Sequence, residues 1–206
     1  MSGFTFRIDS VEVLGPLLAA FAVLLAVRAT RQRPGWHGRP AVTRLVAALY
    51  ATGALHFTLF PVIVDPDQNL SPWTNQVQTI PLQGLLSMDV SFALNVLLFL
   101  PFGILLPLMT RRALGAGRVA LRALAVSATI ELTQLGMYIL FSNGRGADVD
   151  DLITNTLGAT LGCLLLRLAL RSTAFSALTR GFALPGTAFA SPTAETQPAP
   201  ATRQAR

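Results

Sequence analysis

Five long apolar stretches constrain this chain more than any other feature of its sequence. They lie near Val11 to Val27, Leu45 to Val64, Val90 to Met109, Val119 to Leu140 and Leu152 to Leu170. Each is long enough to cross about 30 Å of hydrocarbon as a helix that rises about 1.5 Å per residue. A helix also satisfies its own backbone hydrogen bonds in lipid. The sequence therefore predicts an all-α, polytopic membrane protein, a bundle of about five transmembrane helices.

The composition agrees with a lipid environment. Hydrophobic residues make up 52% of the chain and charged residues only 13%, whereas soluble domains are about 25% charged. The single cysteine, Cys163, excludes an internal disulfide bond. The chain contains no CxxC, HExxH, Walker or GxSxG motif. We therefore predict no cofactor and no metal site.

The positions of the arginines predict how the helices are oriented. All sixteen basic residues are arginine, and fourteen of them follow the first, third or fifth stretch, whereas the opposite side has only Arg7 and Arg145. Cytoplasmic loops close to membrane spans retain positive charge. We therefore expect the amino terminus outside and the carboxyl terminus in the cytoplasm of a bacterial cell membrane. Topology and anionic lipid then explain the net charge of +6 without a nucleic-acid partner.

Composition also divides the chain into three segments. We expect residues 1–44 to form an amino-terminal anchor helix and an Arg-rich cytoplasmic loop, and residues 45–170 to form the main transmembrane domain. Residues 171–206 form a cytoplasmic tail. Its Pro, Ala and Thr content predicts disorder from about residue 183.

Two features outside the main polar residues have alternative interpretations. The external segment from Asp65 to Asp89 contains Trp73 and spaced apolar residues, which fit either an amphipathic lid or an unstructured loop. The lone His56 of the second stretch could be a proton or metal site, but we favour a hydrogen bond inside the bundle because no second ligand is near it in the sequence.

Polar side chains form one stripe on each of two otherwise apolar helices. Glu131 and Gln134 share a face of the fourth helix with Ser127 and Tyr138. In the fifth helix, polar side chains from Arg145 onward likewise fall on one face. With the predicted topology, these groups would line one pocket that opens to the exterior. The candidate ligand-binding residues are Asn95, Glu131, Gln134, Arg145, Asp148, Asp151 and Asn155.

The fifth helix also carries small residues that favour close packing. Gly158 and Gly162 form a small-xxx-small surface, which lets helix backbones approach closely in a membrane. Such packing would bring the polar stripes together. An ionised carboxylate in mid-bilayer costs roughly 2.5 to 3.5 kcal/mol on insertion scales. Glu131 must therefore be neutral, paired or hydrated.

A structural interpretation of the same residues remains open. Asp148 could cap the amino end of the fifth helix, with Asp151 in its first turn, where the helix dipole favours negative charge. Arg145 could pair with these two acids. Glu131 could hydrogen-bond Asn95 or Asn155 and hold the bundle together.

Three sequence runs together resemble a known family. They are NVLLFLPFGILLPL (Asn95 to Leu108), IELTQ (Ile130 to Gln134) and RGADVDDLITNTLGATLG (Arg145 to Gly162). With the upstream TLFP (Thr58 to Pro61), they are similar to the VanZ-like membrane proteins. The resemblance implies a small multispanning envelope protein without a settled enzymatic activity. The family's namesake confers low-level teicoplanin resistance, and homologues are linked to resistance to lipoglycopeptides.

Three functional hypotheses follow. In the first, the pocket binds an amphiphilic envelope molecule, such as a lipid-linked cell-wall precursor or the antibiotic, with Arg145 forked onto an anionic group. In the second, which we favour less, the protein is an intramembrane hydrolase or transferase that uses Glu131 as a base and a cation held by Asp148 or Asp151. The third hypothesis, a proton-coupled transporter, is disfavoured because the chain has only five predicted spans. Membrane lipids are expected partners in every case, and the oligomeric state is left open.

Overall fold

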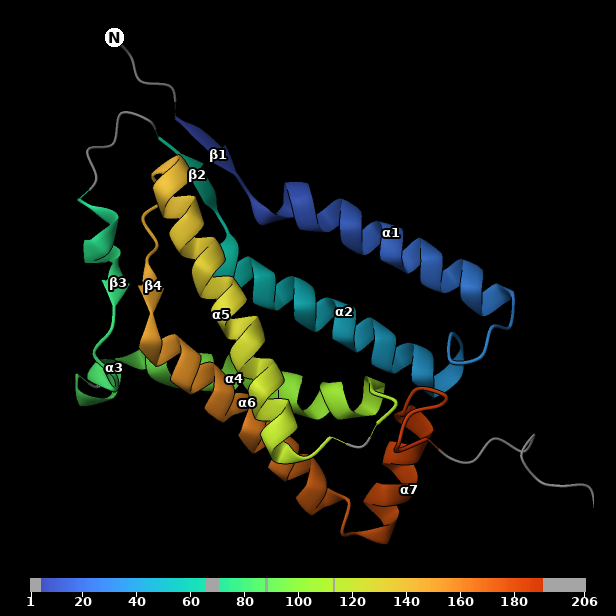
Figure 1. The fold of residues 1–206 in the computed structure, drawn as a ribbon. Coiled ribbons are helices and arrows are strands. Elements are labelled where there is room, and N and C mark those ends of the chain that lie inside the picture. The colour runs from blue at the N-terminus through green and yellow to red at the C-terminus, as the bar shows by residue number, and fades with distance from the viewer. Residues whose placement is uncertain (1–4, 66–70, 88, 113, 191–206) are drawn as a thin grey trace, which may run out of the picture.

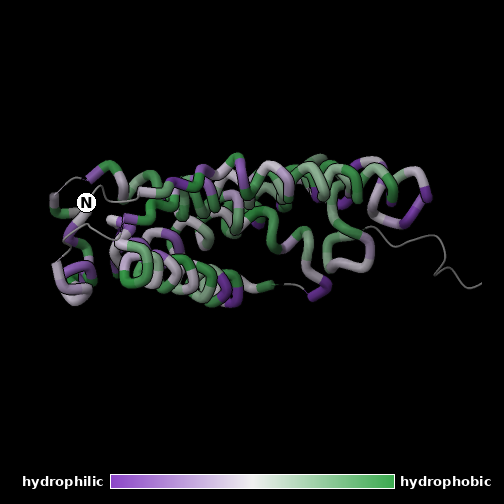
Figure 2. The backbone as a smooth tube through the Cα atoms, turned by 90° about the horizontal axis from the view of Figure 1, so that it is seen from above, coloured by the Kyte–Doolittle hydropathy of each residue, from purple (hydrophilic) through white to green (hydrophobic). Residues whose placement is uncertain are grey.

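Five long apolar helices dominate the structure, a computed structural model that describes residues 5–65, 71–87, 89–112 and 114–190. By length and composition, each of the five could span a membrane. Figure 1 shows their arrangement, and Figure 2 shows hydrophobic residues along their length. The prediction of a largely helical, multi-pass membrane protein is confirmed. The helices are α1 (Ser10–Thr30), α2 (Gly38–Leu59), α4 (Val90–Met109), α5 (Ala116–Phe141) and α6 (Val149–Ala169).

The second helix differs most from the sequence prediction. It ends at Leu59, and residues 62–64, expected inside the second span, form strand β2 (Val62–Val64). Pro61 has no N–H for a helical bond, and a residue before proline avoids helical angles, so Phe60 is extended at φ −111° and ψ 155°. Strand β2 pairs antiparallel with β1 (Phe6–Ile8). The chain is therefore mainly, rather than entirely, α-helical.

The segment between α2 and α4 is folded rather than loose. Its described part contains η1 (Trp73–Gln76), β3 (Val77–Gln78) and the short helix α3 (Gln83–Leu86). Strand β3 pairs in parallel with β4 (Ala147–Asp148). The described part is therefore not an unstructured loop, and the amphipathic lid stays a prediction. All four strands lie at the same end of the long helices (Figure 1).

Helices α4 and α6 pack with their backbones in close contact. A Cβ atom built on Gly158 would lie 2.2 Å from the Val96 carbonyl oxygen, and one on Gly162 would lie 2.1 Å from the Leu100 carbonyl oxygen. Only glycine fits at such positions, because real side chains do not approach a carbonyl oxygen this closely. Around this contact lies a small core formed by Phe99, Leu114, Val119, Ala123, Ala159 and Cys163.

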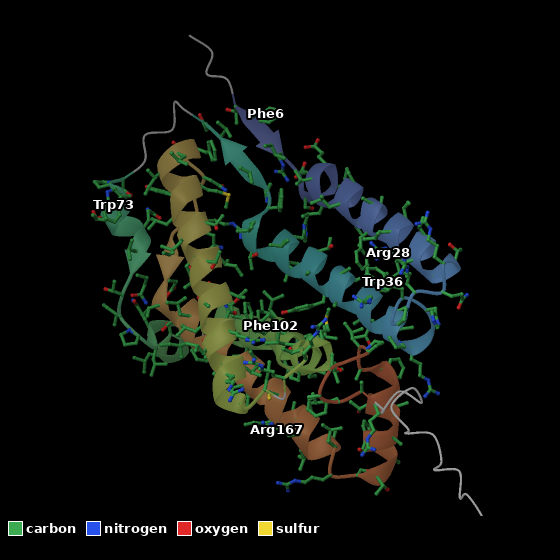
Figure 3. All side chains as sticks on the ribbon, turned by 45° about the vertical axis from the view of Figure 1, so that its right-hand side comes forward. Phe6, Arg28, Trp36, Trp73, Phe102 and Arg167 are labelled. Atoms are coloured by element: carbon green, nitrogen blue, oxygen red, sulfur yellow. The ribbon has the colours of Figure 1, made fainter. Side chains whose placement is uncertain are left out.

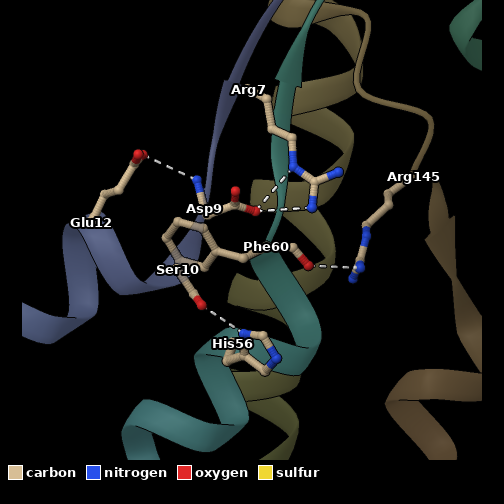
Figure 4. A network of polar contacts seen from close by, with 7 residues as sticks. All are labelled: Arg7, Asp9, Ser10, Glu12, His56, Phe60 and Arg145. Atoms are coloured by element: carbon tan, nitrogen blue, oxygen red, sulfur yellow. Dashed lines mark hydrogen bonds and ion pairs between the residues drawn. The ribbon is translucent and has the colours of Figure 1, made fainter.

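Helices α1 and α2 form a separate hairpin. Near the strands, His56 Nδ1 and Ser10 Oγ are 2.7 Å apart and share a hydrogen bond (Figure 4). The interpretation of His56 as a bundle hydrogen-bonding residue is thus confirmed. At the opposite end of the hairpin, Arg28 and Arg44 lie over the Trp36 ring, at 5.4 and 4.2 Å from its centre. Figure 3 shows Arg28 and Trp36 at this end, away from Phe6 and Trp73.

The region after α6 is folded as far as the structure describes it. Helix α7 (Thr173–Phe182) is followed by residues 183–190, in which Ala183 and Leu184 are buried. The Leu184 N–H donates to the Leu108 carbonyl oxygen at 3.0 Å. The expected disorder from about residue 183 is therefore wrong for residues 183–190, because these apolar side chains pack against the ends of the long helices. Residues 191–206, also expected to be disordered, lie outside the described residues.

Candidate functional site

Three acidic side chains and one amide meet where α4, α5 and α6 converge. Glu131 Oε2 accepts a hydrogen bond from the Asp148 backbone N–H at 2.9 Å. The Glu131 and Asp151 carboxyl groups are close enough to interact with each other. Asn95 Nδ2 donates to Asp151 Oδ1 at 2.5 Å. We call Asn95, Glu131, Asp148 and Asp151 the carboxyl cluster.

Helix α6 continues this network toward the bilayer centre. Ser127 Oγ donates to the Asp151 carbonyl oxygen at 3.3 Å, and Asn155 Nδ2 donates to Ser127 Oγ at 2.9 Å. Asn155 is buried, and its Oδ1 has no hydrogen-bond partner among the described residues. Five of the seven candidate residues are thus brought together by three helices: Asn95, Glu131, Asp148, Asp151 and Asn155.

Asp148 also caps helix α6, as the structural interpretation proposed. Its Oδ1 accepts a hydrogen bond from the Asp150 N–H at 2.8 Å. Burial raises the pKa of the Asp148 carboxyl, and the negative charges of Asp150 and Asp89 raise it further, although the Asp150 N–H bond acts in the opposite direction. The exposed Asp89 caps α4, and its bond from the Ser91 N–H lowers its pKa. Burial at the cluster therefore outweighs the cap at Asp148.

Gln134 and Arg145 bind elsewhere, at the carboxyl end of α2. Gln134 Nε2 donates to the Thr58 carbonyl oxygen at 2.8 Å. The Arg145 guanidinium donates to the carbonyl oxygens of Phe57 and Thr58 at 3.0 and 2.6 Å. It also donates to the Phe60 carbonyl oxygen at 3.0 Å (Figure 4). A cation at this end of a helix is stabilised by the helix dipole. The expected pairing of Arg145 with the acids is therefore not formed, and the seven residues do not line one pocket.

Asp150 has a role that the sequence analysis missed. Its carboxyl group is buried and accepts two backbone hydrogen bonds, from the Leu82 N–H at 2.5 Å and the Gly84 N–H at 2.8 Å. It thereby ties the segment before α4 to the first turn of α6. A run of three acids in DVDD was the available signal, but Asp150 lies off the polar stripe of α6, and its backbone partners have no side-chain signature.

A polar cleft of about 490 Å³ opens beside the carboxyl cluster. Its lining includes the amide side chains of Asn75, Gln76 and Gln78. Residues 79–80 and 146–148 complete it, so that Asp148 belongs to both the cleft and the cluster. The cleft therefore presents amide groups and a carboxyl group, which together donate and accept hydrogen bonds.

An apolar groove lies on another side of the cluster, between α2, α4 and α5. Its volume is about 370 Å³, within the range of small-molecule sites. Ile130 and Thr133, which flank Glu131 in sequence, line it together with Tyr50, Phe99 and Phe102. The Glu131 region of α5 thus has a polar network on one face and an apolar groove on another.

The chemistry available in the cluster is that of carboxyl oxygens that accept hydrogen bonds and one amide that donates. Among the described residues, no group of three or more His, Cys, Asp or Glu side chains is placed to hold a metal ion. The nearby cation, Arg145, is directed to backbone carbonyl groups of α2. Carboxyl and amide groups in this arrangement suit a ligand that offers hydroxyl, amide or amine donors.

Comparison with known proteins places the chain in a family. The family model described as VanZ/LLP1 matches residues 47–170, which include α4, α5, α6 and the carboxyl-terminal part of α2. No curated protein and no solved structure gives a significant match. The matched region contains the whole carboxyl cluster and covers more than half of the 206 residues. This multi-span membrane protein therefore belongs to the VanZ/LLP1 family.

Proposed function

We propose that this protein resides in a bacterial cell membrane and lowers susceptibility to teicoplanin and related lipoglycopeptides. It does so by binding an amphiphilic envelope molecule, either a lipid-linked cell-wall precursor or the antibiotic itself. The ligand's polar part occupies the cleft beside Asp148, on the outer side of the membrane. Membership in the family whose namesake confers teicoplanin resistance supports this role.

The observation that carries the proposal is the position of Asp148. This residue lines the polar cleft, and its backbone N–H is bonded to the buried Glu131 carboxyl. A ligand in the cleft that hydrogen-bonds the Asp148 side chain would therefore act on a group tied to the carboxyl cluster. Uncharged amide side chains around it suit a peptide or glycan, which offers many hydroxyl and amide groups.

The apolar groove supports an amphiphilic ligand rather than a freely soluble one. It lies between membrane-spanning helices and is lined mainly by apolar and aromatic side chains. An alkyl chain there would gain about 0.8 kcal/mol for each methylene that leaves water. The bonds that Arg145 makes to α2 give no support to its predicted role as an anion-binding fork.

The proposal is tested by teicoplanin susceptibility of a bacterial host that lacks its own homologue. We expect the natural chain to raise the minimum inhibitory concentration and Glu131→Gln to abolish the increase. Glutamine can still accept the Asp148 N–H bond, but it lacks the ionisable carboxyl group of glutamate. Glu12→Gln is the matched control, because Glu12 lies in the amino-terminal cap of α1, away from the cluster.

Membrane levels of the three chains are matched by immunoblot. Resistance from the Glu131→Gln chain equal to that of the natural chain would show that the ionisable carboxyl group of Glu131 is not needed. A host that remains fully susceptible with the natural chain would contradict the resistance role. Incubation of the purified protein with a lipid-linked precursor separates binding from the alternative, a hydrolase or transferase: turnover that Glu131→Gln abolishes would favour the enzyme.

A further inference from the structure

Helix α7 has two chemically different faces. At about 100° per residue, Phe175, Leu178 and Phe182 share one side, whereas Thr173 and Arg180 lie on the other. Phe175 and Leu178 are 54% and 47% exposed. On the polar side, Arg180 Nη2 donates to Ser176 Oγ at 3.2 Å. Two large apolar side chains in water would be unfavourable, so this face needs an apolar contact.

The position of α7 places that face at a membrane boundary. Helix α6, a candidate membrane span, ends at Ala169, and α7 begins four residues later at Thr173. The other end of α7 is tied to α2 by the Thr43 hydroxyl, which donates to the Phe182 carbonyl oxygen at 2.6 Å. In Figure 1, α7 lies at the end of the bundle opposite the strands. It is therefore held where the spans leave the bilayer.

An apolar groove runs between α7 and the ends of two spans. Its volume is about 350 Å³, and its lining includes Ile104 and Leu108 of α4, Leu165 of α6, and Phe175 and Leu178 of α7. The exposed residues of α7 thus continue an apolar surface of the spans themselves. The medium in contact with that surface is lipid, because the spans cross the bilayer.

Among the described residues, the charge around α7 is entirely positive. Arg171 precedes the helix, Arg180 lies in its last turn, and Arg39 lies over the Phe182 ring at 5.9 Å. The acidic residues of the described chain lie at the strand end or in the carboxyl cluster: Asp9, Glu12, Asp65, Asp89, Glu131, Asp148, Asp150 and Asp151. Amphipathic helices with phenylalanine and leucine on the apolar face and arginine on the polar face bind anionic lipid surfaces.

We propose that α7 is an interfacial helix that binds anionic phospholipid at the Arg-rich end of the protein. Phe175 and Leu178 insert among the acyl chains beside the groove, and Arg171 and Arg180 contact the phosphate groups of the same leaflet. The helix lies beyond the family match, which ends at residue 170. The lipid contact does not depend on the proposed function.

Bromine quenching of a single tryptophan tests the insertion. The two natural tryptophans, Trp36 and Trp73, are replaced by Phe in the full chain, and Phe175→Trp or Ala177→Trp is added before reconstitution into phosphatidylcholine vesicles with brominated acyl chains. Ala177 is exposed on the polar side and is the matched control. We expect quenching at position 175 to exceed that at position 177 by roughly twofold or more, because only the apolar face enters the acyl region.

A second arm tests the preference for anionic lipid. Vesicles contain the bromine either on phosphatidylglycerol or on phosphatidylcholine, at one overall composition. We expect phosphatidylglycerol to quench Phe175→Trp more strongly, and Arg171→Gln with Arg180→Gln to remove the excess, whereas Arg7→Gln at the strand end keeps it. Equal quenching at positions 175 and 177 would overturn the insertion, and an excess that survives loss of both arginines would overturn the lipid contact. Leu178→Trp repeats the readout if Phe175→Trp does not fold.

Discussion

At the scale of single residues, Asp148 connects three features of the site. It caps α6, lines the polar cleft and donates its backbone N–H to Glu131. Two effects on the Asp148 carboxyl oppose each other. The cap favours the ionised carboxylate, whereas burial beside other acids disfavours it. The raised pKa of Asp148 shows that burial has the larger effect.

Substitution of Asp148 separates these effects. Since its pKa is raised by folding, the folded protein holds the Asp148 proton more tightly than the unfolded chain does, and ionisation above about pH 3.9 lowers stability. Asparagine keeps the cap without the charge, so we expect Asp148→Asn to melt at the same or a higher temperature at pH 7 and to lose any advantage below about pH 3.9.

Asp148→Ala is the control for the cap. It removes the acceptor for the Asp150 N–H and should lose about 1 kcal/mol at pH 7. The stability of all three proteins is measured by the melting temperatures of the detergent-solubilised chains. An Asp148→Asn chain that is less stable than the natural one at pH 7 would contradict the account of the charge.

Sequence spacing located part of the site and missed the rest for a physical reason. Helical periodicity could group side chains that share one stripe or bond to other side chains. Examples are Glu131, Asp151 and Asn155. Gln134 and Arg145 lie near them in sequence, but their partners are backbone carbonyl groups of α2. A backbone acceptor at a distant helix end leaves no trace in the sequence.

At the scale of helices, the α4–α6 contact positions the cluster. Asn95 on α4 reaches Asp151 on α6 because the backbones meet about two turns further along α6, at Gly158. Gly158→Ala would place a Cβ 2.2 Å from the Val96 carbonyl oxygen and push the helices apart. We expect a loss of about 1–3 kcal/mol, as for other overpacked sites, measured by thermal unfolding in detergent.

Gly136→Ala on α5 is the matched control. A Cβ there meets nothing within 4 Å, so better helix propensity should leave stability unchanged or raise it by up to about 1 kcal/mol. Equal stability of the two alanine variants would argue against the close contact of α4 with α6.

The ends of the helices show which boundaries can be predicted from the local sequence. Helix α4 begins and ends where the sequence predicts, because Asp89 caps it and polar residues follow Met109. Helix α2 ends early because Pro61 outweighs the apolar residues that follow it. The folded region at 183–190 was not predictable from composition, since its order comes from packing of Leu184 against α4.

At the scale of the whole molecule, the two ends of the helices differ in charge. The strand end holds Arg7, Arg145 and the acidic residues of the described chain near the cleft, and the opposite end holds the remaining described arginines. From the positive-inside rule we propose that the cleft faces the cell exterior, where envelope precursors and antibiotics meet the membrane. This sidedness, which the proposed function requires, comes from the arginine distribution.

Cysteine labelling of intact cells tests sidedness and binding together. Thr79→Cys lies in the lining of the cleft, Arg112→Cys lies in the loop between α4 and α5, and the natural Cys163 is buried. We expect a membrane-impermeant maleimide to label Thr79→Cys, teicoplanin or added lipid-linked precursor to slow that labelling, and Arg112→Cys to react only after permeabilisation. If intact cells label Arg112→Cys but not Thr79→Cys, the cleft does not face outward. If the labelling rate of Thr79→Cys is the same with and without both compounds, the cleft does not bind them.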